Sequence, residues 1–340
     1  MTTSALTQVY RGLRTVGLTK SQVAAILPAW WEPEVAHSES GLWETALLLG
    51  RRLSLDASAL LQGDIRQTTD ASPPRFKHTA RVTPEQLTPV TLIASSLAKA
   101  VVGAMLPHEP LGRPSALSIC QELLASADAK IDFDTLLGHC WNRGIPVIPL
   151  PNLPKGVRKM DAAAIKVGSR PVIVIALRND SKAWLSFLLA HELGHLCLGH
   201  VADNTAIVEG SLRDTTEFDA ESQLDAQEAE ANAFAHALLG GAEADALIAR
   251  WPAALPAVSL ASLALEQARP LRTAAGHLVL RHAFQTHRWA EARMALNFLA
   301  EDMDAQSSLI RRMQREIDTA EIAEDLQDYV EQITGVAPQV

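Results

Sequence analysis

The stretch Ala190-His191-Glu192-Leu193-Gly194-His195-Leu196 carries the pattern His-Glu-x-x-His, which indicates a metal site on a helix. Positions four apart lie on the same helical face, so His191 and His195 would offer two imidazole nitrogens to one metal ion. Glu192 is turned about 100° around the axis from His191, which lets it reach a water beside the metal without binding the metal itself. We therefore expect His191 and His195 as metal ligands and Glu192 as the general base.

Chance explains this pattern poorly, because 11 histidines among 340 residues would produce roughly 0.02 such pentapeptides at random. The flanking sequence also favours a buried helix, since Asp180 or Ser181 would cap its start. The apolar residues that would bury it are Trp184, Leu185, Leu188, Leu189, Leu193 and Leu196. The sequence thus places the candidate metal ligands on a core helix.

A catalytic zinc site normally has three protein ligands and an open fourth position, so a third ligand must come from another segment. A second helix is expected from Asp219 to Leu239. Glu228 lies at the centre of its apolar stripe, whereas Glu230 points to the opposite side. Because a carboxylate on a buried face needs compensation, which a metal supplies, we expect Glu228 as the third ligand.

Other residues expected near this site are less suitable as metal ligands. Asn232 is expected beside Glu228, and Asp225 and Asp219 remain minor rivals for the metal. His200 follows the first helix and is expected as a partner of the helix dipole or as a surface residue. Other acids of this segment, Glu217, Glu221 and Glu230, are expected on a solvated face.

The two motifs resemble those of a known group of metallopeptidases. The HELGH helix followed by Glu228-Ala229-Glu230-Ala231-Asn232-Ala233-Phe234-Ala235 is similar to the ImmA/IrrE family, whose second motif is E-x-x-A-N-x-F-A. The resemblance covers roughly residues 140 to 240. The sequence also excludes the metzincin family, because the metzincin pattern requires a glycine and a histidine at the positions where this chain has Leu198 and Val201. The resemblance implies a cytoplasmic zinc endopeptidase that cuts a transcriptional repressor under DNA damage or mobile-element stress.

Composition sets outer bounds on the class of protein. A hydrophobic content of 48% over 340 residues is enough for one or two packed cores, and the net charge of −9 disfavours a globally nucleic-acid-binding surface. The three cysteines, Cys120, Cys140 and Cys197, lack metal-type spacing and fit a reducing compartment. Since no run of 18 apolar residues and no signal peptide is present, we expect a cytoplasmic protein that does not enter membranes.

Residues 1–62 resemble an Xre-type helix-turn-helix domain through Gly17-Leu18-Thr19-Lys20 and the helix expected from Leu42 to Leu53. The segment Trp30–Glu39, where that family carries its base-reading helix, holds three glutamates, Pro33 and no lysine or arginine. DNA phosphates would repel such a segment, so a protein contact or a vestigial role is favoured over DNA binding. The tryptophans Trp30, Trp31 and Trp43 are expected as core or interface aromatics.

We expect an α+β, mostly helical protein with a zincin-like metallopeptidase core flanked by helical regions. The expected boundaries are a linker at 63–82, the metallopeptidase domain at 83–240 and a C-terminal helical domain at 241–340. Within the core, Ile145–Leu150 would be an edge strand because of its prolines, and Ala162–Val167 with Val172–Leu177 would form an antiparallel hairpin whose edge holds the substrate. The C-terminal helices are expected at residues 257–268, 278–284, 289–299 and 307–333.

The function expected from these features is zinc-dependent cleavage of a partner protein, with DNA as a further candidate ligand or activator. Oxyanion stabilisation would fall to His236, His200 or Arg213, since the only tyrosines, Tyr10 and Tyr329, lie far from the motif in sequence. The alternative is a non-catalytic regulator or antitoxin-like protein that uses the same core and the Xre-like domain to bind partners. An intact Glu192 disfavours that alternative, because a binding site has no need of a general base.

Overall fold

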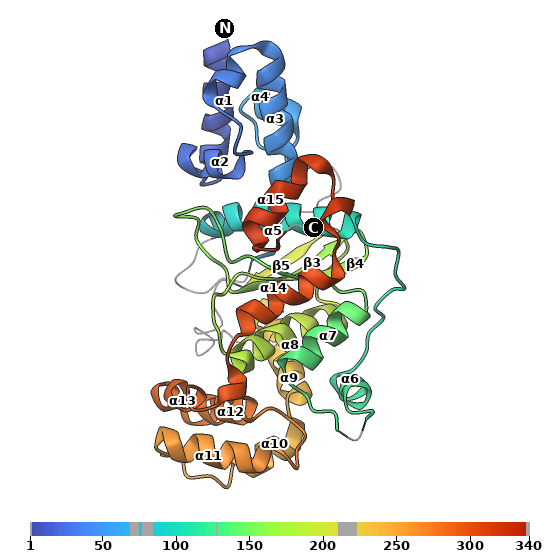
Figure 1. The fold of residues 1–340 in the computed structure, drawn as a ribbon, viewed down its shortest axis with the longest axis vertical. Coiled ribbons are helices and arrows are strands. Elements are labelled where there is room, and N and C mark those ends of the chain that lie inside the picture. Colours follow the sequence, from blue (N-terminus) through green and yellow to red (C-terminus); the bar gives the residue numbers. More distant parts are fainter. Residues whose placement is uncertain (1, 69–74, 77–83, 127, 210–222, 338–340) are drawn as a thin grey trace.

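The computed structural model describes residues 2–68, 75–76, 84–126, 128–209 and 223–337. The molecule is elongated, with the N-terminal helices at one end, a small sheet with its covering helices in the middle, and a helical bundle at the other end (Figure 1). Within these ranges, no helix combines the length and the apolar character needed to cross a membrane. The fold is mostly helical with one sheet, as the sequence predicted.

The sheet has five strands in the order β1-β5-β3-β4-β2 and is mixed rather than purely antiparallel. Its strands are β1 Arg75–Phe76, β2 Val147–Pro149, β3 Ala162–Val167, β4 Arg170–Ile175 and β5 Ala206–Glu209. The hairpin β3–β4 forms as expected, except that its second strand starts at Arg170, which pairs with Val167 across a tight turn. The proline-containing strand β2 lies at the sheet edge, as expected from its missing backbone donors.

The hairpin was wrongly expected to offer a free edge to a substrate. Strand β3 pairs with both β4 and β5, and β4 pairs with both β3 and β2, so neither hairpin strand has an unpaired side. The edge positions belong to β1 and β2 instead. The sequence predicted the hairpin and the edge strand near residues 145–150, but it gave no sign that β5 and β1 would extend the sheet beyond β3.

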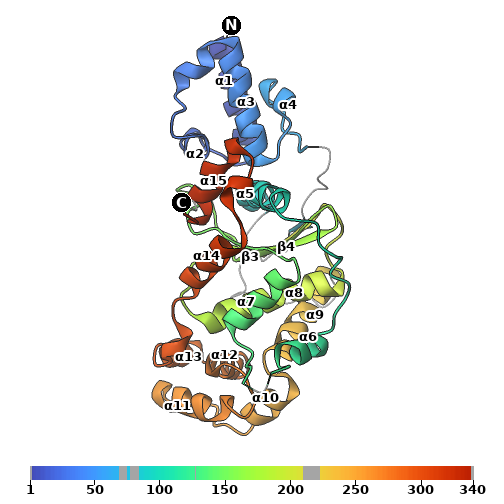
Figure 2. The same ribbon diagram turned by 45° about the vertical axis from the view of Figure 1, so that its right-hand side comes forward.

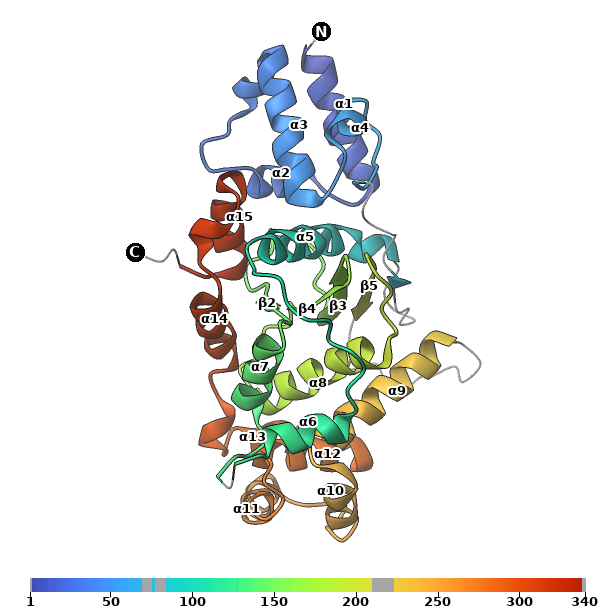
Figure 3. The ribbon, with the colours of Figure 1, turned by 90° about the vertical axis from the view of Figure 1, so that its right-hand side faces the viewer.

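Helices cover both faces of this sheet. Helix α5 (Pro84–Gly103) packs on one face against β3 and β4, and α8 (Lys182–Leu198) packs on the other (Figure 3). Helix α9 (Gln223–Leu238) then packs on α8. Two further helices, α6 (Ala116–Leu123) and α7 (Phe133–Asn142), contact α9 and α8. The helix that carries the His-Glu-x-x-His pattern is therefore enclosed between the sheet and neighbouring helices.

The N-terminal region is a compact group of helices. Its members are α1 Thr2–Thr15, α2 Lys20–Ile26, the short 3-10 helix η1 Pro33–His37, α3 Glu39–Leu53 and α4 Ala57–Leu61. Helix η1 lies within residues 30–39, the segment that the resemblance to an Xre-type domain assigns to the recognition helix. Trp31 is buried and donates a hydrogen bond from its indole to Thr45, whereas Trp30 and Trp43 are exposed, so only Trp31 belongs to the core.

Residues 241–340, expected as one helical domain, divide between two cores. Helices α10 (Gly241–Ile248), α11 (Ala257–Ala268), α12 (Ala275–Thr286) and α13 (Trp289–Leu296) form a bundle with its own apolar core. Helices α14 (Ala305–Glu316) and α15 (Glu324–Thr334) leave the bundle and join the main core, where they pack on the sheet region and on α3. In Figures 1 and 2, α15 lies between the N-terminal helices and the middle of the molecule.

The prediction of a single helix from 307 to 333 was wrong, because the helix is interrupted between α14 and α15. Ile317 ends α14 in an extended conformation. Asp318 then accepts a hydrogen bond from the backbone amide of Ala320, which stabilises a short 3-10 turn in place of the helix. The break lets each half bury its apolar face against a different partner.

Arg52 joins the N-terminal region to α15. Its side chain is only 1% exposed, and its guanidinium donates hydrogen bonds to the backbone carbonyls of Ile26 (2.8 Å) and Asp325 (2.9 Å) and to the Asp328 carboxylate (2.5 Å). The Tyr329 ring lies 5.3 Å from the guanidinium carbon. Replacing the buried Arg52 side chain should destabilise the fold, because the two backbone carbonyls and the Asp328 carboxylate would then lose their hydrogen-bond donor.

We predict that Arg52→Met lowers the free energy of unfolding by about 3 kcal/mol, because it breaks a buried charged network. Arg51→Met is the matched control, since the neighbouring Arg51 is half exposed in its ion pair with Asp325 and should lose less than about 1 kcal/mol. Urea unfolding followed by circular dichroism measures both changes. Equal losses in the two variants would contradict the role assigned to Arg52.

Candidate metal centre

Helix α8 holds His191, Glu192 and His195 in a fully buried position. Its start is capped by Ser181, as the sequence allowed, and Asp302 accepts a hydrogen bond from the backbone amide of Ala183 (2.6 Å). Nearly every residue of α8 is buried, because the helix is enclosed by the sheet, α7 and α9. The two imidazoles are thereby fixed in a region from which bulk water is excluded.

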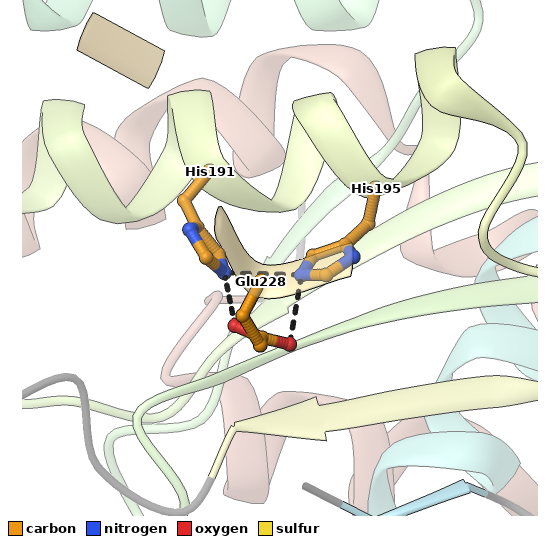
Figure 4. Close-up of side chains that lie close together, drawn as sticks. All are labelled: His191, His195 and Glu228. Carbon is orange, nitrogen blue, oxygen red and sulfur yellow. Dashed lines mark hydrogen bonds and ion pairs between the residues drawn. The ribbon is translucent and has the colours of Figure 1, made fainter. Parts of the chain in front are cut away.

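Helix α9 brings Glu228 to these two histidines. A Cβ atom added at Gly194 would lie 3.3 Å from the Cα of Ala231, so the missing side chain allows α8 and α9 to approach closely. The Glu228 carboxylate lies 3.2 Å from His191 Nε2 and 3.3 Å from His195 Nε2, and the two Nε2 atoms are 3.0 Å apart (Figure 4). Glu228 is only 2% exposed. The helical-face argument thus selected the acid that the structure places beside both histidines.

Hydrogen bonds outside this group determine which ring nitrogens carry protons. His191 Nδ1 lies 3.0 Å from Asn232 Oδ1, an acceptor, so this ring donates there and its Nε2 keeps a lone pair. His200 Nε2 lies 2.9 Å from the Glu230 carboxylate and donates to it. The remaining His200 nitrogen then accepts from His195 Nδ1 at 3.0 Å. We therefore assign an unprotonated Nε2 to His195 as well.

His200 has a role that the sequence reading missed. It was expected as a dipole partner or a surface residue, and also named as a candidate for oxyanion stabilisation, yet it is 9% exposed and orients His195. Gly199 ends α8 with φ of 77°, and this left-handed turn brings His200 back beside the helix. Glu230 points away from Glu228 and is 62% exposed at its side chain, as expected, but it holds His200. The sequence signal that could have indicated this role of His200 is the glycine that directly precedes it at the end of the helix.

The donor set fits a divalent metal ion. The ligand atoms of His191, His195 and Glu228 lie within 4.8 Å of one another, and no other such group of histidine, cysteine or acidic residues occurs among the residues that the structure describes. Three lone-pair donors that face each other at 3.0–3.3 Å repel one another unless a cation lies between them. Tetrahedral zinc with ligands at about 2.0–2.1 Å spaces such atoms about 3.3 Å apart.

Without a cation, the histidines affect the ionisation of Glu228. When Nε2 of these rings carries a proton in place of the cation, burial raises the pKa of this carboxyl, but hydrogen bonds and charge from His191 and His195 outweigh burial and hold the pKa well below its ordinary value. Glu228 is therefore an anion at neutral pH. An anion enclosed in the protein interior is a ligand suited to zinc.

The other residues that the sequence placed near the site do not join the metal group, and they are His200, His236 and several residues outside the described ranges. His200 is held between His195 and Glu230, and His236 packs against Phe187 with ring centroids 5.3 Å apart. Burial lowers the pKa of His236 to about 4, so this ring is neutral at pH 7. Other expected residues, Arg213, Glu217, Asp219, Glu221 and the side chain of Asp225, lie outside the described residues.

The cysteines take no part in the metal group. All three are free thiols, and Cys140 and Cys197 are buried. Burial raises the pKa of Cys197 to about 12, so it stays protonated and is a poor metal ligand. Cys197 is therefore a core residue of α8.

Comparison with known proteins supports the class of site that the geometry indicates. Residues 140–240 match the peptidase family model described as the IrrE N-terminal-like domain. The match supports the resemblance of this segment to the ImmA/IrrE family of metallopeptidases, which its two motifs indicated. The match does not include the N-terminal region, whose Xre-like character stays a prediction. No curated protein and no solved structure shows significant similarity to the chain.

We predict one zinc ion per chain, bound by His191, His195 and Glu228, because two imidazoles and a carboxylate suit zinc. Elemental analysis of protein purified without added metal would measure it. Glu228→Ala should remove most of the zinc, whereas the same change at the exposed Glu243 should leave it in place. A wild-type value near zero, with no zinc uptake on titration, would refute the assignment.

We also predict that His200→Ala weakens zinc binding by about 10- to 100-fold, because His195 loses the partner that fixes its ring and its tautomer. Competition with a fluorescent chelator measures the affinity. The exposed His37 provides the control, and His37→Ala should bind zinc as the wild type does. An unchanged affinity in His200→Ala would show that His195 does not depend on this contact.

Proposed function

We propose that the protein is a cytoplasmic zinc-dependent endopeptidase that cleaves a partner protein. The observation that supports this most strongly is the convergence of three buried metal-type donors directly beside Glu192, within a segment that matches a metallopeptidase family model. When bound there, zinc supplies a Lewis acid that polarises a carbonyl and lowers the pKa of a water from about 15.7 to about 7.

The chain's own residues supply the remaining chemistry of this proposal. Glu192 accepts the proton of the attacking water and passes it to the leaving amine. Asn232 and His200 orient the two imidazoles through the hydrogen bonds described above. Burial of the site strengthens these electrostatic interactions, because little water is present to screen them.

The substrate in this proposal is a transcriptional repressor, and the cleavage belongs to a stress or mobile-element response. This part is supported by the resemblance of the two motifs to the ImmA/IrrE family. DNA is a candidate activator on the same ground. Co-expression with repressors encoded by adjacent genes tests the substrate, with and without damaged or single-stranded DNA.

We predict that Glu192→Gln lowers turnover by about 10² to 10⁴ while zinc content and fold are kept, since only the proton acceptor is lost. Appearance of repressor fragments in a cell lysate, together with elemental analysis, measures the two effects. Glu243→Gln makes the same chemical change on an exposed position of α10 and should cleave normally. If the wild type cleaves no candidate while the Glu192→Gln variant keeps every cellular phenotype, the protein acts as a regulator instead.

A further inference from the structure

A cavity of about 620 Å³ lies beside the first half of α8, where α12 and α13 face it. Its wall is aromatic, with Trp184 and Phe187 from α8, Phe284 from α12 and Trp289 from α13. Trp184 and Trp289 meet edge to face with ring centroids 5.8 Å apart, and Phe284 meets Trp289 in the same way at 4.8 Å. The bundle of α10–α13 and the peptidase helix thus enclose this cavity together.

The cavity continues the face of α8 that carries the metal ligands. Trp184, Phe187, His191 and His195 are spaced by three, four and four residues, so they follow one another along one side of the helix. The ring of Phe187 lies 6.3 Å, centroid to centroid, from the ring of His191. At 1.5 Å per residue, Phe187 and Trp184 lie about 6 Å and about 10 Å along the axis from His191.

The polar side chains of the cavity divide into two kinds. Ser181 donates a hydrogen bond to Asp302 at 2.5 Å, and Asp302 also holds the amide of Ala183, so these groups are occupied in capping α8. Asp180, Arg293 and Asn297 are exposed and also line the cavity. The wall is therefore suited to an apolar group, and the exposed part carries both an acceptor and donors for the amides and carbonyls of a peptide backbone.

We propose that this cavity is a specificity pocket, which accepts a large apolar or aromatic side chain of the protein substrate. An extended peptide advances about 3.3 Å per residue, so the distances of about 6 to 10 Å along α8 place that side chain about two to three residues from the scissile bond. Burial of a phenylalanine side chain corresponds to a preference over alanine of about tenfold to a hundredfold. The inference rests on the proposed peptidase activity, and it names the class of sequence that the enzyme selects.

Cleavage of a proteome-derived peptide library by the zinc-loaded protein, followed by mass spectrometry, tests the pocket. We expect Phe, Tyr, Trp, Leu and Met to be enriched about tenfold at one fixed position two to three residues from the cut. Asn297→Phe adds a ring to the pocket lining and should reduce this enrichment to background. Met294→Phe places the same ring on α13 at an exposed position outside the cavity and should keep the wild-type profile.

A second measurement separates failure of the pocket from failure of the peptidase. Fluorine NMR would follow N-acetyl-4-fluorophenylalaninamide with zinc-loaded Glu192→Gln protein, where binding needs no turnover. We expect binding that Asn297→Phe weakens at least tenfold and Met294→Phe does not. Cleavage without the enrichment, or with an enrichment that survives Asn297→Phe, overturns the pocket alone. Absence of all cleavage overturns the peptidase proposal, and probe binding in that case identifies a small-molecule site instead of a substrate pocket.

Discussion

The repulsion among three buried lone-pair donors is the constraint on which this structure depends. His191, His195 and Glu228 present acceptor atoms to one another at about 3 Å, and all three side chains are buried. Such an arrangement is unfavourable by itself, so the fold must hold the donors together until a cation compensates them. The close contact of α8 and α9 at Gly194 and the outer hydrogen bonds from Asn232 and His200 provide that restraint.

The C-terminal bundle reinforces both ligand-bearing helices. Arg281 of α12 is buried and donates hydrogen bonds to the carbonyls of His236 and Gly241, just where α9 ends. Asp302, which follows α13, caps the start of α8. Arg281 is a cation at the carboxyl end of α9, and Asp302 is an anion at the amino end of α8. Each charge interacts favourably with the dipole of the helix that it contacts. The bundle therefore acts as part of the metal centre's support, although it lies outside the matched peptidase segment.

Sequence periodicity predicted those features that depend on one helix at a time. It selected His191 and His195 by their spacing, and it selected Glu228 over Glu230 because only one of these acids faces the apolar stripe. It failed where the outcome depends on tertiary contacts. The role of His200 depends on the turn at Gly199, and the number of strands beside the hairpin depends on segments far away in the chain.

The N-terminal region shows how a tertiary contact changes the meaning of a resemblance. In an Xre-type domain, a recognition helix must project from the surface to enter a major groove. In the segment that resembles this helix, the structure has only the five-residue 3-10 helix η1, which contains Glu34 and follows Glu32, and such acidic side chains would repel phosphates. The neighbouring α3 carries Arg52, which is buried against α15 at the other end of the sequence. Because α15 shares its apolar core with the peptidase sheet, the region is integrated into the body of the molecule through α15.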